Sequence, residues 1–333
     1  MPPLEPAPTL GLFEACWHYL VLGVVQGLTE FLPISSTAHL KVVPVVLGWG
    51  DPGVAVTAVI QLGSIVAVIA FFRRDLVEVF GGMVQALRQG DWQTPPARLG
   101  VAVALGTLPI VVAGLAVELF VPDFDNSPLR SLHSIGAVSI GMAILLGLAE
   151  QLGRRRRVLG DVQVRDGLLV GLAQALAVVP GVSRSGSTLT ASLFEGWRRA
   201  DAARFSFLLG IPSITLAGLF KLKSAFAEPI AGGAIPLLVG IVTAALVSWL
   251  AIAWLLRFLQ SNSTWWFVGY RLLFGLSLLL FAGRFGAAAS CVPGLPRPPP
   301  PRSKQPGRGA DWVQLVSGGT ARVEGALGGC EPG

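Results

Sequence analysis

A polar motif interrupts the first long apolar stretch of the chain. It reads Gln26-Gly27-Leu28-Thr29-Glu30-Phe31-Leu32-Pro33-Ile34-Ser35-Ser36-Thr37-Ala38-His39. The motif places a carboxylate, an amide, several hydroxyls and an imidazole in a region otherwise apolar enough for a lipid bilayer. Ionisable groups are costly at membrane depth and usually face a partner or a wet cavity. The motif therefore predicts a functional site.

A second polar motif interrupts another apolar stretch and supplies the positive charge that the first motif lacks. It reads Pro180-Gly181-Val182-Ser183-Arg184-Ser185-Gly186-Ser187-Thr188. The planar guanidinium of Arg184 suits phosphate oxygens, although a structural ion pair with Glu30 is the alternative. The two motifs together predict a membrane site for a phosphorylated ligand.

Hydroxyl residues follow a helix-stopping proline in each motif. Ser35, Ser36 and Thr37 offer N-caps for a helix after the first break, and Ser183 and Ser185 do so after the second. Free backbone N–H groups at two helix N-termini form a natural phosphate cradle. We therefore predict that these residues surround a phosphate, the alternative being that the hydroxyls only cap helices.

Glu30 needs a different role, because a carboxylate does not bind an anion directly. It can ligate a divalent cation that bridges to phosphate, or it can handle protons. Gln26 lies four residues earlier, on the same helix face, and can add an oxygen ligand or a hydrogen bond. Glu30 and Gln26 are thus the predicted metal ligands.

His39 is the candidate general base, acting on a serine or on a water molecule. Ser36 precedes it by three residues, so both project from one side of the helix start. This spacing makes Ser36 the better nucleophile candidate and Ser35 the second. The predicted catalytic set is Ser36, His39, Glu30 and Arg184. For Arg271, in the last apolar segment, a structural role is favoured over phosphate binding.

The composition defines the class of protein. Of 333 residues, 53% are hydrophobic and 13% charged, against about 25% charged in soluble domains. The net charge of +6 comes from basic residues in short loops between apolar runs, which indicates membrane topology rather than nucleic-acid binding. We predict an all-α, polytopic integral membrane protein in contact with membrane lipids.

Six segments are long enough to cross a bilayer, since each holds about twenty residues. They are 53–72, 99–120, 132–152, 204–222, 234–256 and 265–284. The stretches 11–50 and 167–200 are broken by the polar motifs, and a break at membrane depth must be surrounded by protein or water. Each is therefore predicted to be a re-entrant helical hairpin.

The distribution of Lys and Arg predicts the orientation. The connectors 73–98, 153–166, 198–204 and 257–263 carry thirteen, while the opposite connectors 40–52, 121–131 and 221–233 carry four. The first set is predicted to be cytoplasmic, because cytoplasmic loops are rich in Lys and Arg. The run Arg154-Arg155-Arg156-Arg157 is interpreted as a solvated topogenic signal.

A weak internal repeat accompanies this topology. Gly23-x-x-Gln26 precedes the first break, and Gly171-x-x-Gln174 precedes the second, 148 residues later. One hairpin plus three spans per copy is an odd number of crossings, so the copies must be inverted, as in proteins with broken helices around a central site. We predict a membrane domain over 1–284, with repeats over 11–152 and 167–284, and a disordered tail over 285–333.

With these residues in view, the chain resembles the undecaprenyl-diphosphatase family, the membrane enzymes associated with bacitracin resistance. The matching segments are Gln26 to His39, Gln61 to Ser64, Pro180 to Thr188, Arg204 to Leu209 and Tyr270-Arg271. The likeness covers about residues 11–284 and omits the tail.

The resemblance implies a reaction and a location. The family hydrolyses undecaprenyl diphosphate to undecaprenyl phosphate and inorganic phosphate, which recycles the lipid carrier for the cell wall. Its members use Mg²⁺ or Ca²⁺ and act at the periplasmic face of the bacterial inner membrane. The resemblance implies that Ser36 and His39 are catalytic, that Arg184 clamps phosphate, and that Gln26 and Glu30 fill the acidic motif. Gln26 leaves that motif one carboxylate short.

A second hypothesis is a transporter or flippase for a phosphorylated prenyl lipid. Inverted repeats with broken helices are a plan that many secondary transporters share. A carrier needs binding groups but no nucleophile beside a base, so substitution of Ser36 and His39 separates the two hypotheses.

Overall fold

The computed structural model describes residues 11–121, 124, 127–225 and 233–290. Helices are the only regular secondary structure in this part of the chain, apart from one isolated backbone bridge between Arg157 and Trp197. The elements of the N-terminal half are α1 (Leu12–Phe31), α2 (Ser36–Val46), α3 (Gly53–Phe71), α4 (Arg73–Gln89), α5 (Pro95–Phe120), η2 (Pro128–Arg130) and α6 (Leu132–Leu152). Those of the C-terminal half are η3 (Leu159–Asp161), α7 (Val164–Ala175), η4 (Leu176–Val178), α8 (Arg184–Phe194), α9 (Arg199–Ala225), α10 (Ala234–Ser261) and α11 (Trp265–Ser290).

The predicted all-α, multi-pass membrane class is confirmed. Within the described residues, α5, α6, α9 up to Phe220 and α10 are each long and apolar enough to cross a bilayer. The pair α3 and α4, bent by 67°, passes the same test as one broken span, and α11 has a shorter apolar part. Every one of the six predicted spans therefore coincides with a helix.

Residues 73–98, which the sequence predicts to be a connector, contain the 17-residue helix α4. Its sequence is too polar for a span, but Leu76, Val79, Met83 and Ala86 recur at helical spacing. These apolar residues form one stripe, which packs along α5. A search for long apolar runs does not detect such an amphipathic helix.

The two polar motifs break their helices at the predicted places. Ser35 precedes α2 with φ 78°, and Ser183 precedes α8 with φ 70°. Left-handed backbone is unusual for a residue with a side chain and is held by surrounding structure. α2 and α8 are both 11 residues long. The chain thus builds the same turn twice.

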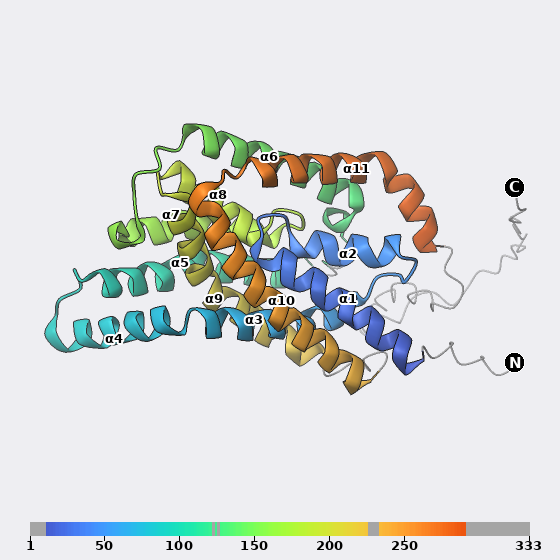
Figure 1. The fold of residues 1–333 in the computed structure, drawn as a ribbon, viewed down its shortest axis with the longest axis horizontal. Helices are drawn as coiled ribbons and strands as arrows, with labels where there is room; N and C mark the ends of the chain where they lie inside the picture. The colour runs from blue at the N-terminus through green and yellow to red at the C-terminus, as the bar shows by residue number, and fades with distance from the viewer. Residues whose placement is uncertain (1–10, 122–123, 125–126, 226–232, 291–333) are drawn as a thin grey trace, which may run out of the picture. The chain divides into compact units, whose positions relative to one another are not determined.

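Several helix–helix contacts of the N-terminal half also correspond to contacts of the C-terminal half. α1 packs along α10 and α7 along α5, while α2 touches α11 and α8 touches α6 (Figure 1). α6 and α11 lie side by side, where Gly136 and Gly275 bring the backbones together: a Cβ on either would come within 2.9 Å of the other's carbonyl oxygen. These contacts of the N-terminal half therefore have counterparts in the C-terminal half.

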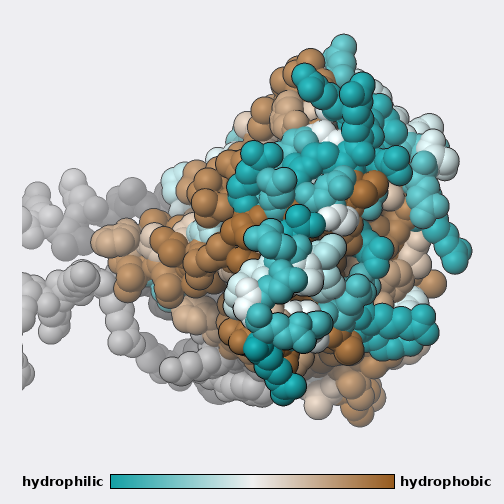
Figure 2. Space-filling model, turned by 90° about the vertical axis from the view of Figure 1, so that its left-hand side faces the viewer, coloured by the Kyte–Doolittle hydropathy of each residue, from teal (hydrophilic) through white to brown (hydrophobic). Residues whose placement is uncertain are grey.

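One end of the membrane domain is hydrophilic. Figure 2 looks onto the side where, in Figure 1, the α4–α5 turn and the segment before α7 lie, and polar residues gather there. Exposed charged residues of these segments are Arg88, Asp91, Arg154, Arg156, Asp161 and Arg165. Part of the Arg154–Arg157 run is paired rather than simply solvated, since Arg157 bonds Asp166.

The boundary of the predicted tail differs from the helical boundary. α11 continues to Ser290, so residues 285–290 are helical rather than part of a structureless tail. The remainder of the predicted tail, like residues 1–10 of the predicted membrane domain, lies outside the described residues.

Candidate active site

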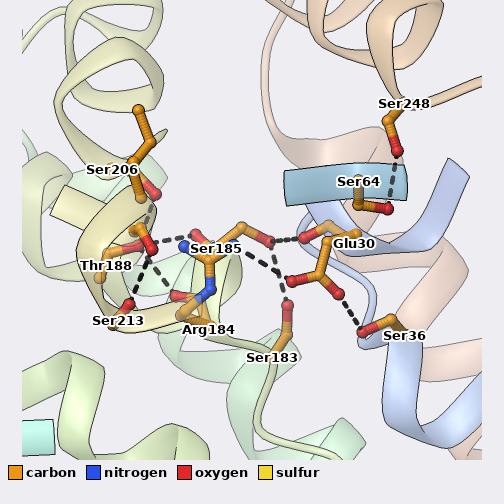
Figure 3. Close-up of polar contacts among 12 residues, drawn as sticks. Glu30, Ser36, Ser64, Ser183, Arg184, Ser185, Thr188, Ser206, Ser213 and Ser248 are labelled. Carbon is orange, nitrogen blue, oxygen red and sulfur yellow. Dashed lines mark hydrogen bonds and ion pairs between the residues drawn. The ribbon is translucent and has the colours of Figure 1, made fainter. Parts of the chain in front are cut away.

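Glu30 is the centre of the site, near the end of α1. Its side chain is buried, with a relative exposure of 8% for the residue. Arg184 donates from Nη2 to one carboxylate oxygen at 3.3 Å. Ser36 donates from Oγ to the other oxygen at 2.8 Å, and Gln26 donates to that same oxygen at 3.1 Å. Figure 3 shows Glu30 between Arg184 on one side and Ser36 on the other. The fold therefore brings both polar motifs to one carboxylate.

Ser36 is the first residue of α2 and lies directly after the left-handed Ser35. Its hydroxyl proton points at Glu30, a carboxylate that can accept it. No side chain caps the N-terminus of α2, so the first-turn N–H groups lack the usual Ser or Asp acceptor. Helix N-termini in this condition attract anions. Ser36 thus has both a proton acceptor and a nearby position suited to phosphate.

Arg184 occupies the corresponding first position of α8. Its guanidinium lies against Gly210 of α9, where a Cβ would fall 1.6 Å from Nη1. Nη1 is buried and has no hydrogen-bond partner among the described residues. An unpaired buried donor on a cation is costly, so this group is suited to an acceptor supplied by a ligand. The predicted phosphate clamp remains a prediction that this geometry favours.

Ser183 and Ser185 have structural partners. The Ser183 hydroxyl caps α8 by accepting from Gly186 N–H at 3.1 Å. Ser185 donates to the carbonyl of Leu32 at 3.0 Å and thereby joins the two breaks. The predicted cradle is therefore uneven: α8 is capped by its own serine, whereas α2 is not. Thr37 is exposed and lines the cavity described below.

His39 is not directed at Ser36, contrary to the predicted pairing. Its Nδ1 lies 2.7 Å from the carbonyl of Ser35 and its Nε2 lies 2.6 Å from the hydroxyl of Tyr270 on α11. A carbonyl only accepts, so Nδ1 donates to it, and in a neutral ring Nε2 then accepts from Tyr270. The ring also stacks on Phe274 with a centroid distance of 4.3 Å. In this arrangement His39 secures the turn at Ser35, and the only carboxylate that touches Ser36 among the described residues is Glu30.

Arg271 holds both breaks together, which confirms the structural role predicted for it. It is 1% exposed and donates to the carbonyls of Pro33, Val182 and Gly181 at 3.1, 3.1 and 2.7 Å. Hydrogen bonds from a buried cation are among the stronger ones in proteins. One guanidinium therefore fixes the two turns that carry Ser36 and Arg184.

Gln26 belongs to a buried polar chain that sequence analysis did not find. Its amide donates to Glu30 and lies 3.4 Å from the hydroxyl of Ser64, which accepts from Ser248 at 2.8 Å. Ser248 is buried in α10, 222 residues after Gln26. Nothing in local spacing links serines so far apart. This chain fixes the orientation of Gln26 and so supports the carboxylate of Glu30.

A cavity of about 90 Å³ opens beside Ser36 and Glu30. Gln26, Glu30 and Ser36 line it together with residues that the sequence analysis did not assign to the site. These are Leu40, Lys41, Asp51, Gly53, Thr57, Ala58, Gln61 and Arg130. Lys41 lies four residues after Thr37, a helical spacing that could have indicated its position.

The oxygen-rich cavity fits a hard divalent cation only in part. Glu30, Gln26 and Ser36 offer oxygen atoms, and Asp51 adds a carboxylate at the exposed edge. No cluster of three or more His, Cys, Asp or Glu side chains within the described residues could hold a metal ion. This set suits an ion such as Mg²⁺ that is held by one or two carboxylates and by substrate phosphates.

These features define a multi-pass, all-helical membrane protein whose site joins a serine, a carboxylate and a guanidinium at two broken helices. The family model described as bacitracin resistance protein BacA matches residues 19–277. The chain belongs to this family.

The curated relatives agree with the family assignment and are each named undecaprenyl-diphosphatase. One from Synechococcus sp. (strain RCC307) is 70% identical over 276 residues, which are 83% of this chain and 96% of the relative. Another from Parasynechococcus marenigrum (strain WH8102) is 66% identical over 284 residues, 85% of this chain and 99% of the relative. A third from Prochlorococcus marinus (strain MIT 9313) is 67% identical over 273 residues, 82% of this chain and 91% of the relative.

Proposed function

We propose that this protein is an undecaprenyl-diphosphate phosphatase, a hydrolase that converts undecaprenyl diphosphate to undecaprenyl phosphate and inorganic phosphate. The reaction recycles the lipid carrier for cell-wall synthesis. The names and high identity of the relatives support this function. The observation that carries it is the contact of one buried carboxylate with both Ser36 and Arg184. A carrier has no need of a hydroxyl directed at a proton acceptor.

Ser36 and Glu30 form the reacting pair of this proposal. The Ser36 oxygen attacks the terminal phosphorus while its proton passes to Glu30, the carboxylate to which it already donates. The anhydride P–O bond breaks, and its electron pair leaves on the bridging oxygen with undecaprenyl phosphate. Water then hydrolyses the phosphoserine, releases inorganic phosphate and restores the serine.

Arg184 and the N-terminus of α2 bind the terminal phosphate. Nη1 of Arg184 needs an acceptor, and the first turn of α2 has no side-chain cap. Donors fixed in a site of low dielectric stabilise the charge of the transferring phosphoryl group. His39 supports this geometry indirectly, through the carbonyl of Ser35 and the hydroxyl of Tyr270.

A divalent cation, Mg²⁺ or Ca²⁺, is the proposed cofactor, with Glu30 and Gln26 as its protein ligands. Such an ion neutralises charge on the diphosphate when it is bound. The Gln26 side chain directs nitrogen at Glu30, and a turned amide would present its oxygen to a cation instead, since the two ends have nearly the same size and shape. Because Glu30 is the single buried carboxylate of this ligand set, binding of the ion depends strongly on the substrate phosphates.

The proposed location is the bacterial inner membrane, with the site open to the periplasm. The cavity is lined by Lys41, Asp51 and Arg130, which come from two connectors predicted to lie outside because they contain few Lys and Arg residues. The proposed topology has six spans and two re-entrant hairpins arranged as an inverted repeat. The matching left-handed turns and the paired helix contacts support it.

Phosphate release from purified protein tests the proposal. We expect release from undecaprenyl diphosphate with Mg²⁺ or Ca²⁺ present, and a loss of more than about a thousandfold in kcat in Ser36→Ala. Ser261→Ala, an exposed serine at the end of α10, is the matched control and should retain wild-type turnover. If wild-type protein releases no phosphate, the proposed function is wrong. If Ser36→Ala keeps a tenth of the activity, water rather than the serine is the nucleophile.

A further inference from the structure

Two basic side chains line the cavity next to Ser36 without belonging to either polar motif. Lys41 extends from α2 and Arg130 from η2. The ammonium of Lys41 donates to the carbonyl of Arg130 at 2.7 Å, so the two residues hold α2 and η2 against each other. Both are only partly exposed.

These two cations lie in connectors that contain few Lys and Arg residues. The connectors 40–52 and 121–131 contain one basic residue each, Lys41 and Arg130. Basic residues are disfavoured on the outer side of a membrane protein. Since both line the same cavity, a local function explains them better than topology does.

The geometry of α2 sets the separation of these cations from the reacting serine. Lys41 lies five residues after Ser36, about 7.5 Å further along the helix axis at 1.5 Å per residue. Ser36, Lys41 and Arg130 line the same cavity, together with Thr37 and Glu30. Arg184 reaches this group through its contact with Glu30.

The charge of the cavity includes two carboxylates. Glu30 is held by Arg184 and by the Ser36 hydroxyl, as described above. Asp51 is exposed, and one of its oxygens accepts from the backbone N–H of Gly53 at 2.9 Å. The cavity therefore contains negative as well as positive side chains. A ligand that binds Lys41 and Arg130 must either compete with the carboxylates of Glu30 and Asp51 or interact with both charges.

We infer that Lys41 and Arg130 form a second phosphate subsite, which binds the phosphate esterified to the prenyl chain while the terminal phosphate lies at Ser36. The inference rests on the proposed diphosphatase function. When the anhydride bond breaks, its bridging oxygen leaves with the prenyl phosphate and carries the electron pair. Cations at that position stabilise the leaving group and favour diphosphate over monophosphate substrates.

Steady-state kinetics on the purified full-length protein tests the subsite. The variants are Lys41→Met, which keeps the aliphatic stem, and Arg130→Gln. Lys41→Arg restores the charge, and Arg88→Gln removes an exposed charge at the end of α4. A prenyl diphosphate is the substrate, and prenyl monophosphate and inorganic phosphate are the inhibitors. Thermal unfolding of each variant reports whether it folds.

We expect Lys41→Met and Arg130→Gln each to raise KM and the inhibition constant of prenyl monophosphate about tenfold, the loss expected for one charged hydrogen bond. Inhibition by inorganic phosphate should stay within about twofold of wild type, and Lys41→Arg and Arg88→Gln should resemble wild type. Direct binding of prenyl monophosphate, measured without turnover, should weaken in the same two variants.

Three results would overturn the inference. They are an unchanged KM and unchanged binding in Lys41→Met, a change confined to inorganic phosphate, or an equal change in Arg88→Gln. Failure of the proposed function gives a different result, because wild-type protein would then hydrolyse no prenyl diphosphate. In that case the binding measurement alone still tests whether Lys41 and Arg130 hold a prenyl phosphate.

Discussion

The two broken helices share a backbone and differ in chemistry. α2 begins at Ser36 and α8 at Arg184, 148 positions apart, and a left-handed serine precedes each. At the first helical position, α2 has the hydroxyl of Ser36 and α8 has the guanidinium of Arg184. Glu30 of the first copy corresponds at the same offset to Val178 of the second. The two turns therefore share a backbone conformation, and the candidate site residues are divided between them.

This division has a physical consequence. A carboxylate and a guanidinium on one turn could satisfy each other locally, without the second turn. Because they lie on different turns, a complete site exists only where both turns meet, and Arg271 fixes that meeting through three carbonyls of the two breaks. The caps differ accordingly: Ser183 closes the start of α8, whereas the start of α2 has no side-chain cap.

The largest effect among the remaining substitutions is expected at Glu30, the group that the second turn lacks. Glu30→Gln removes the proton acceptor of Ser36 and one ligand of the proposed cation. We expect kcat to fall by about a thousandfold and the dependence on divalent ions to weaken, as measured by phosphate release over a metal titration. An unchanged metal dependence would place the cation elsewhere.

The corresponding test of the second turn is Arg184→Lys, which keeps the charge but loses the planar fork. We expect kcat/KM to fall about a hundredfold, because a bidentate arrangement is lost. Arg165→Lys, an exposed site, is the control. A near-normal kcat/KM would show that only the charge matters.

Gly210→Ala tests the position of Arg184 without changing either motif. A Cβ there would fall 1.6 Å from Nη1, so the guanidinium must move. We expect a fall of roughly tenfold in kcat/KM, since small misplacements of a binding group are costly. Gly114→Ala on α5 has open space and should behave as wild type. Equal activity of both variants would show that the close contact between Gly210 and the Arg184 guanidinium has no role in activity.

Substitution of His39 tests whether this residue acts as a general base or only holds the turn at Ser35. Because its nitrogens contact Ser35 and Tyr270, we expect His39→Gln to retain more activity than Glu30→Gln, with a loss of about tenfold. Tyr270→Phe removes the other end of the same hydrogen bond and should show a loss of similar size. A loss in His39→Gln as large as that in Glu30→Gln would restore His39 as the base.

The smallest effect concerns Glu195, which follows α8 outside the membrane-spanning segments. Burial, together with the charge of Asp166, raises its pKa to about 7, against opposing effects of Trp197 and Arg157. The folded state thus favours the protonated carboxyl, and this stabilisation, present below about pH 4.5, is lost as the pH rises through 7. Relative to wild type, Glu195→Gln should gain about 1–3 kcal/mol in free energy of unfolding at pH 8 and little at pH 5. Parallel pH profiles of Tm would contradict this.

The sequence alone determined the membrane class, the places of the two breaks and the residues of the central contact. Apolar runs of bilayer length indicate spans whatever their neighbours are, and charged residues inside such runs indicate a site because burying them is costly. Glu30, Ser36 and Arg184 could therefore be predicted. The amphipathic helix α4 was missed because its apolar stripe is short and interrupted by charges.

Only the tertiary structure decided which partner each group has. Helical spacing places Ser36 and His39 on neighbouring positions of one turn, but it does not state which helices face them. Ser36 meets Glu30 six residues away, whereas His39 meets Tyr270 at a separation of 231 residues. Lys41 and Arg130 likewise share a cavity although 89 residues separate them. Contacts between distant segments depend on how whole helices pack, and the local periodicity of the sequence does not predict that packing.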